Sequence, residues 1–80
     1  MAAGPTPKQL YSAKRRLCIL AEYEAKAQGY DVRRYGARGV DVFSLTGVYI
    51  GTLKPKVLRA SNGEACVLLE TTSPTLQGLV

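Results

Sequence analysis

Residues 40–50 read VDVFSLTGVYI and decide how the chain folds. The runs Val40 to Leu45 and Val48 to Leu53 follow the period of two that is typical of strands. Between them, Thr46-Gly47 predicts the tight turn of a hairpin. A shift of one residue in this hairpin would exchange the two faces of the sheet, so the turn decides which side chains enter the core.

Two loop lengths fit this turn. A two-residue loop pairs Leu45 with Val48 and mixes apolar and polar side chains on both faces. A three-residue loop with Gly47 in a bulge position pairs Ser44 with Val48, and we favour it because it gathers the aliphatic side chains on one side. The predicted core face then carries Val40, Val42, Val48 and Ile50, joined by Tyr30 and Val32. The predicted reverse face carries Arg33, Tyr35, Asp41, Phe43 and Tyr49.

A long helix precedes the strands. Thr6-Pro7-Lys8-Gln9 is typical of a helix start, because Thr6 can cap, Pro7 suits the first helical position and Gln9 can complete a capping box. No breaker follows until Gly29, which can adopt the left-handed conformation that ends a helix. Side chains at spacings of three and four form its apolar stripe, namely Leu10, Ala13, Leu17, Leu20, Ala21 and Glu24.

Further strands flank this hairpin. Residues 30–35 form the first, and Lys54-Pro55 ends the third because proline has no donor for a ladder. Asn62-Gly63 predicts a last hairpin between residues 57–60 and 64–71. The sequence therefore predicts an α+β fold, with one long N-terminal helix on an antiparallel meander sheet of three to five strands. We expect a flexible lead at 1–5, a single domain at 6–71 and a flexible tail at 72–80.

Several kinds of chemistry are excluded. The chain has no histidine, and its two cysteines, Cys18 and Cys66, lack metal-ligand spacing, so we expect no metal, no cofactor and no enzyme. Both cysteines are expected to be small buried hydrophobic side chains in a reducing compartment, which we take to be the cytoplasm. The longest apolar run, Leu17 to Ala21, is too short to span a bilayer, and glutamates on the polar side of the helix argue against membrane binding.

The net charge of +5 fits either an anionic partner or a charged surface that serves only solubility. Cations interleave with aromatic rings between residues 30 and 60, a composition suited to phosphates, carboxylates and bases. The predicted partner-binding residues are Arg33, Tyr35, Phe43, Tyr49, Arg34, Arg38, Lys54, Lys56 and Arg59. A secondary basic patch is predicted at Lys14, Arg15 and Arg16. Alternatively, the last hairpin folds over the rings through Leu58, Val67 and Leu69 and buries them.

Three functions remain open for such a domain. The first is a small stoichiometric inhibitor or adaptor that docks an acidic or nucleic-acid-binding surface of a protein partner, like the compact proteins of phages and mobile elements, anti-CRISPR proteins among them. The second is a basic nucleic-acid-binding accessory or regulatory protein. The third is a homo-oligomeric structural subunit whose aromatic faces meet across a two-fold axis. We place the protein partner first because the sequence contains no nucleic-acid-binding motif.

Overall fold

The helix begins and ends where the sequence predicts. The computed structural model describes residues 4–80, and in it α1 spans Pro7–Ala27. The Thr6 side chain accepts a hydrogen bond from the Gln9 backbone N–H, and the Thr6 backbone N–H donates one to the Gln9 side-chain Oε1. Gly29 follows the helix with a φ of 92°, a conformation that L side chains rarely adopt. The capping box and the glycine stop are thereby confirmed.

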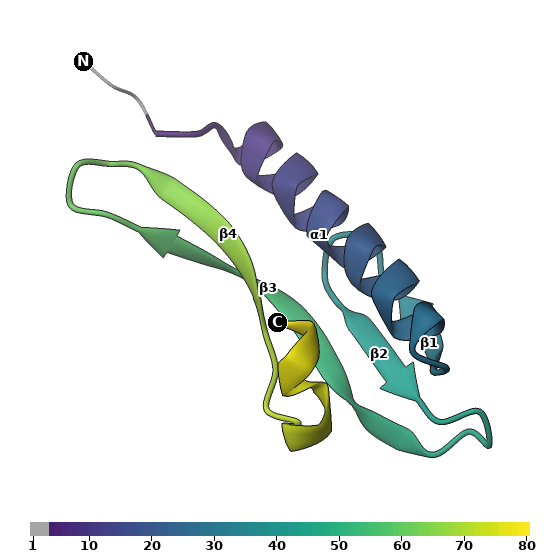
Figure 1. Cartoon of the computed structure of the whole chain (residues 1–80). Helices are drawn as coiled ribbons and strands as arrows, with labels where there is room; N and C mark the ends of the chain where they lie inside the picture. The colour runs from purple at the N-terminus through teal and green to yellow at the C-terminus, as the bar shows by residue number, and fades with distance from the viewer. Residues whose placement is uncertain (1–3) are drawn as a thin grey trace.

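Four antiparallel strands form one sheet in the order β1-β2-β3-β4. They are β1 (Asp31–Arg34), β2 (Val40–Phe43), β3 (Tyr49–Arg59) and β4 (Ala65–Glu70). Figure 1 shows α1 running along this sheet, with β3 as its longest strand. The α+β meander predicted from the sequence is confirmed, with four strands. Among residues 4–80, no helix has the length and hydrophobicity needed to cross a lipid bilayer.

The turn between β2 and β3 has the favoured three-residue loop. Ser44 N donates to Val48 O over 2.8 Å, so these two residues pair. Gly47 has a φ of 88° and occupies the bulge position. Val40 and Val42 are fully buried beneath α1, as predicted.

A second bulge changes which side chains of β3 point toward the core. Phe43 pairs with Tyr49, but Val42 pairs with Gly51, so Ile50 is an extra residue in β3. Beyond it, Gly51 and Leu53 face the core instead of Ile50 and Thr52. Ile50 still packs against the core from a half-buried position. The prediction that Val48 lies in the core is wrong, because this side chain is 63% exposed.

Pro55 does not end β3, contrary to the prediction. Ala60 N donates to Glu64 O, and hydrogen-bonded pairs alternate along an antiparallel ladder, so Pro55 and Leu69 form a non-hydrogen-bonded pair. The Pro55 nitrogen therefore points away from β4. On the opposite edge of β3 there is no strand beside Pro55, because Val40, the first residue of β2, pairs with Leu53. The missing N–H costs no ladder bond, and β3 continues to Arg59.

The last hairpin forms at Asn62-Gly63, as predicted, with Gly63 at a φ of 86°. It extends the sheet and does not fold over the rings. Leu58 and Leu68 on its outer face are 44% and 37% exposed. The alternative in which this hairpin buries the aromatic face is therefore wrong.

The chain after β4 is ordered, although the sequence predicts a flexible tail at 72–80. Residues Pro74–Leu79 form the 3-10 helix η1, and Leu76 is fully buried in the core. It packs beside Gly51, so η1 lies on the same side of the sheet as α1 (Figure 1). Of the predicted lead, residues 1–3 lie outside the described part of the chain, and Gly4 lies against the Gly63 carbonyl.

The core is built from small residues on the helix and larger ones beneath it. Cys18, Ala21 and Ala25 form the buried stripe of α1. Such short side chains let the helix approach the sheet closely. The remaining buried members are Val40, Val42, Leu53 and Leu76. Since α1 and η1 both cover this side, no element formed by residues 4–80 covers the opposite side of the sheet.

Candidate binding surfaces

The uncovered side of the sheet, here called the reverse face, follows from the strand register. Asp31 pairs with Phe43, and Arg33 pairs with Asp41. These side chains point away from the side that carries the buried Val42 and the partly buried Val32. The same side continues through β3 and β4. Its residues are Asp31, Arg33, Asp41, Phe43, Tyr49, Thr52, Lys54, Lys56, Leu58, Cys66, Leu68 and Glu70.

Two aromatic rings and a short chain of hydrogen bonds organise this face. The Phe43 and Tyr49 rings meet edge to face, with centroids 5.7 Å apart. Thr52 Oγ1 donates to Asp41 Oδ1 over 2.7 Å. Because a threonine hydroxyl carries one proton, the Tyr49 hydroxyl must be the donor in its hydrogen bond to Thr52. Tyr49 is thus held in place although its side chain is 58% exposed.

The reverse face is electrically balanced. Its cations are Arg33, Lys54 and Lys56, and its carboxylates are Asp31, Asp41 and Glu70. Lys56 Nζ lies 3.7 Å from Glu70 Oε2. A shallow pocket of about 340 Å³ on this side is lined by Tyr49, Thr52, Lys54, Glu70, Thr71 and Thr72. The whole net charge of +5 therefore resides outside the reverse face.

A second surface lies where α1 meets the turn between β1 and β2. A pocket of about 590 Å³ there is lined by Tyr11, Lys14, Tyr35, Gly36, Ala37, Arg38 and Pro55. A neighbouring hollow of about 500 Å³ on the outer side of α1 is lined by Tyr11, Ser12, Arg15, Arg16, Ile19 and Leu20. Tyr11 lines both, so they form one continuous region, which we call the helix–turn surface.

The cations of the helix–turn surface have no carboxylate partners. Within the described chain, neither pocket is lined by aspartate or glutamate. The three ion pairs found among residues 4–80 involve other cations, namely Lys26, Arg34 and Lys56. Lys14, Arg15, Arg16 and Arg38 therefore present uncompensated positive charge.

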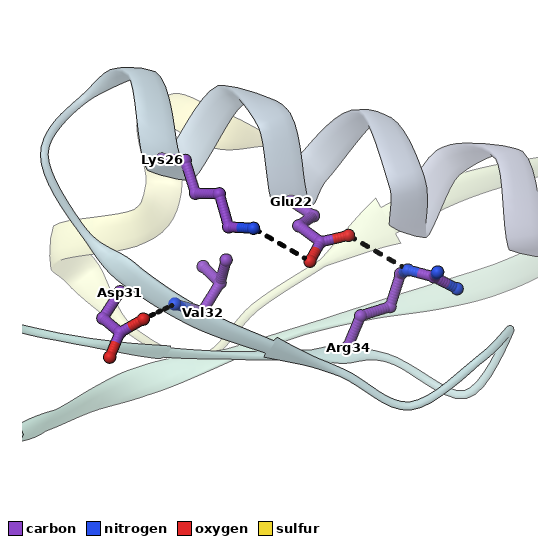
Figure 2. Close-up of polar contacts among 5 residues, drawn as sticks. All are labelled: Glu22, Lys26, Asp31, Val32 and Arg34. Carbon is purple, nitrogen blue, oxygen red and sulfur yellow. Dashed lines mark hydrogen bonds and ion pairs between the residues drawn. The ribbon is translucent and has the colours of Figure 1, made fainter.

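Glu22, one of the two carboxylates on α1, already forms ion pairs. Figure 2 shows it between two cations, with Oε1 3.1 Å from Arg34 Nε and Oε2 3.3 Å from Lys26 Nζ. Partial burial acts to raise the pKa of the Glu22 carboxyl, but the hydrogen bonds from Arg34 and Lys26 outweigh it and lower the pKa below its ordinary value. Glu22 thus links α1 to β1 as an anion.

The predicted site residues fall into separate groups. Arg33, Phe43, Tyr49, Lys54 and Lys56 share the reverse face, as the pattern of alternation indicates. Tyr35 and Arg38 instead join Lys14 in the pocket of the helix–turn surface, next to Arg15 and Arg16.

Two predicted residues belong to neither group. Arg34 points to the helix side and pairs with Glu22. Arg59 lies at the tip of the last hairpin, lining a hollow of about 270 Å³ with Leu58 and Cys66. Tyr11 was not among the predicted site residues. It lies three residues before Lys14 on a helix, where such residues are neighbours, and this spacing was the available signal.

Neither cysteine has partners for metal binding. Among residues 4–80, no three histidine, cysteine, aspartate or glutamate side chains gather as ligands would. Cys18 is buried in the core, where burial raises the pKa of its thiol more than the positive charge of Arg34 lowers it. The prediction that Cys66 is buried is wrong, because this residue points to the reverse face of the last hairpin and is exposed.

Neither a protein-family model, nor a curated protein, nor a solved structure matches this chain. What the protein does therefore has to follow from its two surfaces.

Proposed function

We propose that the protein acts by binding, without catalysis, and that its helix–turn surface docks on an acidic surface of a protein partner. A stoichiometric inhibitor or adaptor works in this way. The observation that carries the proposal is the group of four cations without ion-pair partners, Lys14, Arg15, Arg16 and Arg38, around the rings of Tyr11 and Tyr35. Uncompensated charge of one sign steers an oppositely charged partner and selects against others.

The aliphatic part of this surface favours a protein partner. Leu20 is 54% exposed and lines the same hollow as Ile19, Arg15 and Arg16. Arginine and aromatic side chains around an apolar centre are the composition of protein-binding hot spots. A phosphate backbone would use the cations but would gain nothing from the exposed aliphatic groups.

Nucleic acid is the second candidate. The pocket beside the turn places Tyr11 and Tyr35 next to Lys14 and Arg38, so that bases could stack on rings while cations meet phosphates. The two free cysteines support a reducing compartment, and we place the protein in the cytoplasm on that ground.

A titration of the ¹⁵N-labelled protein followed by NMR tests the proposal. The probes are poly-L-glutamate as an acidic polypeptide and a twelve-nucleotide oligothymidine. We expect poly-L-glutamate to shift the amide signals around Lys14 and Arg38, and to bind at least tenfold more weakly to Lys14→Glu. The matched control is Lys8→Glu, which makes the same charge change at an exposed helix position outside both pockets.

Three results separate the candidates. Binding of poly-L-glutamate that depends on Lys14 but not on Lys8 supports the acidic protein partner. Binding of oligothymidine alone, falling steeply with salt because phosphates release counterions, would favour nucleic acid instead. Shifts confined to the reverse face, or no binding of either probe at low salt, would remove the helix–turn surface as the functional site.

A further inference from the structure

We propose that the reverse face is the contact surface of a symmetric homodimer, in which two copies stack their uncovered sheets face to face. This contact lies on the side opposite α1, so it leaves the helix–turn surface free for the acidic partner. Two sheets stacked in this way lie about 10 Å apart, with the side chains of both inner faces interleaved.

Charge identifies the occupant as a second copy. Across a two-fold axis the same patch meets itself, so a patch of one sign would repel its copy. The reverse face carries three cations and three carboxylates, so each cation can meet a carboxylate of the other copy. The helix–turn surface, with cations and no lining carboxylate among the described residues, cannot pair with itself.

The exposed apolar side chains supply the driving force. Tyr49 is 58% exposed, and Leu58 and Leu68 are 44% and 37% exposed. Phe43 lies half-buried against Tyr49 on the same face. Each buried square ångström of apolar surface contributes about 25 cal/mol, so covering these side chains favours association.

Three polar side chains of the reverse face already hydrogen-bond to one another. Tyr49 donates to Thr52, and Thr52 donates to Asp41 across β2 and β3. A polar group that keeps its hydrogen bond when it is covered avoids most of the desolvation cost. The network also holds the Tyr49 ring in one position before association, so less side-chain entropy is lost on binding.

The exposed area of the elongated chain is large enough to include an interface. The monomer exposes 5541 Å², whereas a compact monomer of 8.6 kDa exposes roughly 4,700 Å². The excess is of the order of the 800 Å² or so that one subunit contributes to a standard interface. Among the described residues, no element packs over the reverse face, so this face has the area for such an interface.

Sedimentation equilibrium of the purified protein, over a range of concentrations, tests this dimer. We expect the wild-type mass to approach twice 8.6 kDa as the concentration rises. Arg33→Glu/Lys54→Glu makes the reverse face strongly negative, and Asp31→Lys/Glu70→Lys makes it strongly positive. Each variant alone is expected to dimerise at least tenfold more weakly, whereas an equimolar mixture of the two is expected to regain a dimer.

The mixture separates repulsion from misfolding, because two unfolded chains would not restore a discrete dimer. Arg15→Glu/Arg16→Glu changes the charge by the same amount on α1 and is expected to leave the dimer unchanged while weakening poly-L-glutamate binding. A wild-type chain that stays monomeric at millimolar concentration would overturn the proposal. So would a wild-type dimer that survives both reverse-face variants, since its contact would then lie elsewhere.

Discussion

Gly51 on β3 lies directly against Ser73, at the start of η1. A Cβ atom added to Gly51 would stand 2.5 Å from the Ser73 Cβ and 3.1 Å from Leu76 Cδ1. Real Cβ atoms do not approach a neighbour so closely. The absence of a side chain at position 51 is therefore what lets the C-terminal segment pack on the core side of the sheet.

Gly51→Ala is expected to lower the free energy of unfolding by about 1–3 kcal/mol, the usual cost of adding a methyl group to a packed contact. Chemical denaturation monitored by circular dichroism measures it. Gly78→Ala is the control, because a Cβ there meets nothing within 4 Å and the backbone conformation suits alanine. Equal stabilities of the two variants would show that η1 does not press on β3.

Leu76→Ala is expected to cost about 2–5 kcal/mol, because it leaves a cavity in the core. Leu76 is fully buried together with Val42 and Leu53. Thr75→Ala, at the exposed position next to it, should change stability by less than about 0.5 kcal/mol. If the segment frayed, as the sequence suggests, the two variants would unfold at the same denaturant concentration.

Glu22→Gln is expected to lower stability by about 1 kcal/mol at neutral pH, because it weakens the hydrogen bonds to Arg34 and Lys26. The pKa of the Glu22 carboxyl is lowered by folding. Its contribution is therefore fully present above the unfolded-state pKa of about 4.3 and is lost as the pH falls through the lower folded-state pKa.

Thermal unfolding between pH 2 and pH 7 checks this dependence. The stability difference between wild type and Glu22→Gln should close in the acid part of the range. Glu24→Gln, an exposed position on the same helix, should follow the wild-type curve. A difference that persists unchanged at pH 2 would mean that the ionised carboxylate is not what stabilises the contact.

The two thiols are expected to react at very different rates. Cys66 is exposed, whereas Cys18 is buried and the pKa of its thiol is raised, which disfavours the reactive thiolate. Brief treatment with iodoacetamide should add one label to the native protein and two in denaturant, as counted by mass spectrometry. In Cys66→Ser the fast label should disappear. Two labels acquired at one rate in the native state would contradict the burial of Cys18.

Local signals in the sequence were sufficient for much of the fold. Thr6 and Gly29 bound the helix because capping and left-handed backbone are chemistry of a few neighbouring residues. Gly47 and Gly63 mark the two hairpins for the same reason. From these turns the reverse-face placement of Phe43 and Tyr49 follows correctly.

The predictions fail where contacts between residues far apart in the sequence decide the local structure. The bulge at Ile50 allows Gly51 to face Ser73, which lies more than twenty residues later in the chain. An isolated glycine in a strand does signal a bulge or a close approach, and this was the available clue. Pro55 is tolerated within β3 because the pairing with β2 stops at Leu53. The residues next to Pro55 in the sequence do not show where that pairing stops.

The sequence predicted most residues of the candidate surfaces but not which residues share a surface. Alternation along the strands brings Arg33, Lys54 and Lys56 to one face. The carboxylates that neutralise this face come from three different strands, so the balance appears only once the register is known. Conversely, Tyr35 and Arg38 become part of a basic surface because α1 crosses beside their turn.

The helix–turn surface is positive, whereas the reverse face is electrically neutral. Paramagnetic relaxation of the amide protons by small anionic and cationic nitroxides measures this potential residue by residue. We predict that the anionic probe relaxes the amides of Lys14, Arg15 and Arg38 far more than the cationic probe, while Phe43 and Tyr49 respond to both equally. Equal relaxation by the two probes on both sides, or stronger relaxation by the anionic probe on the reverse face, would contradict this difference in charge.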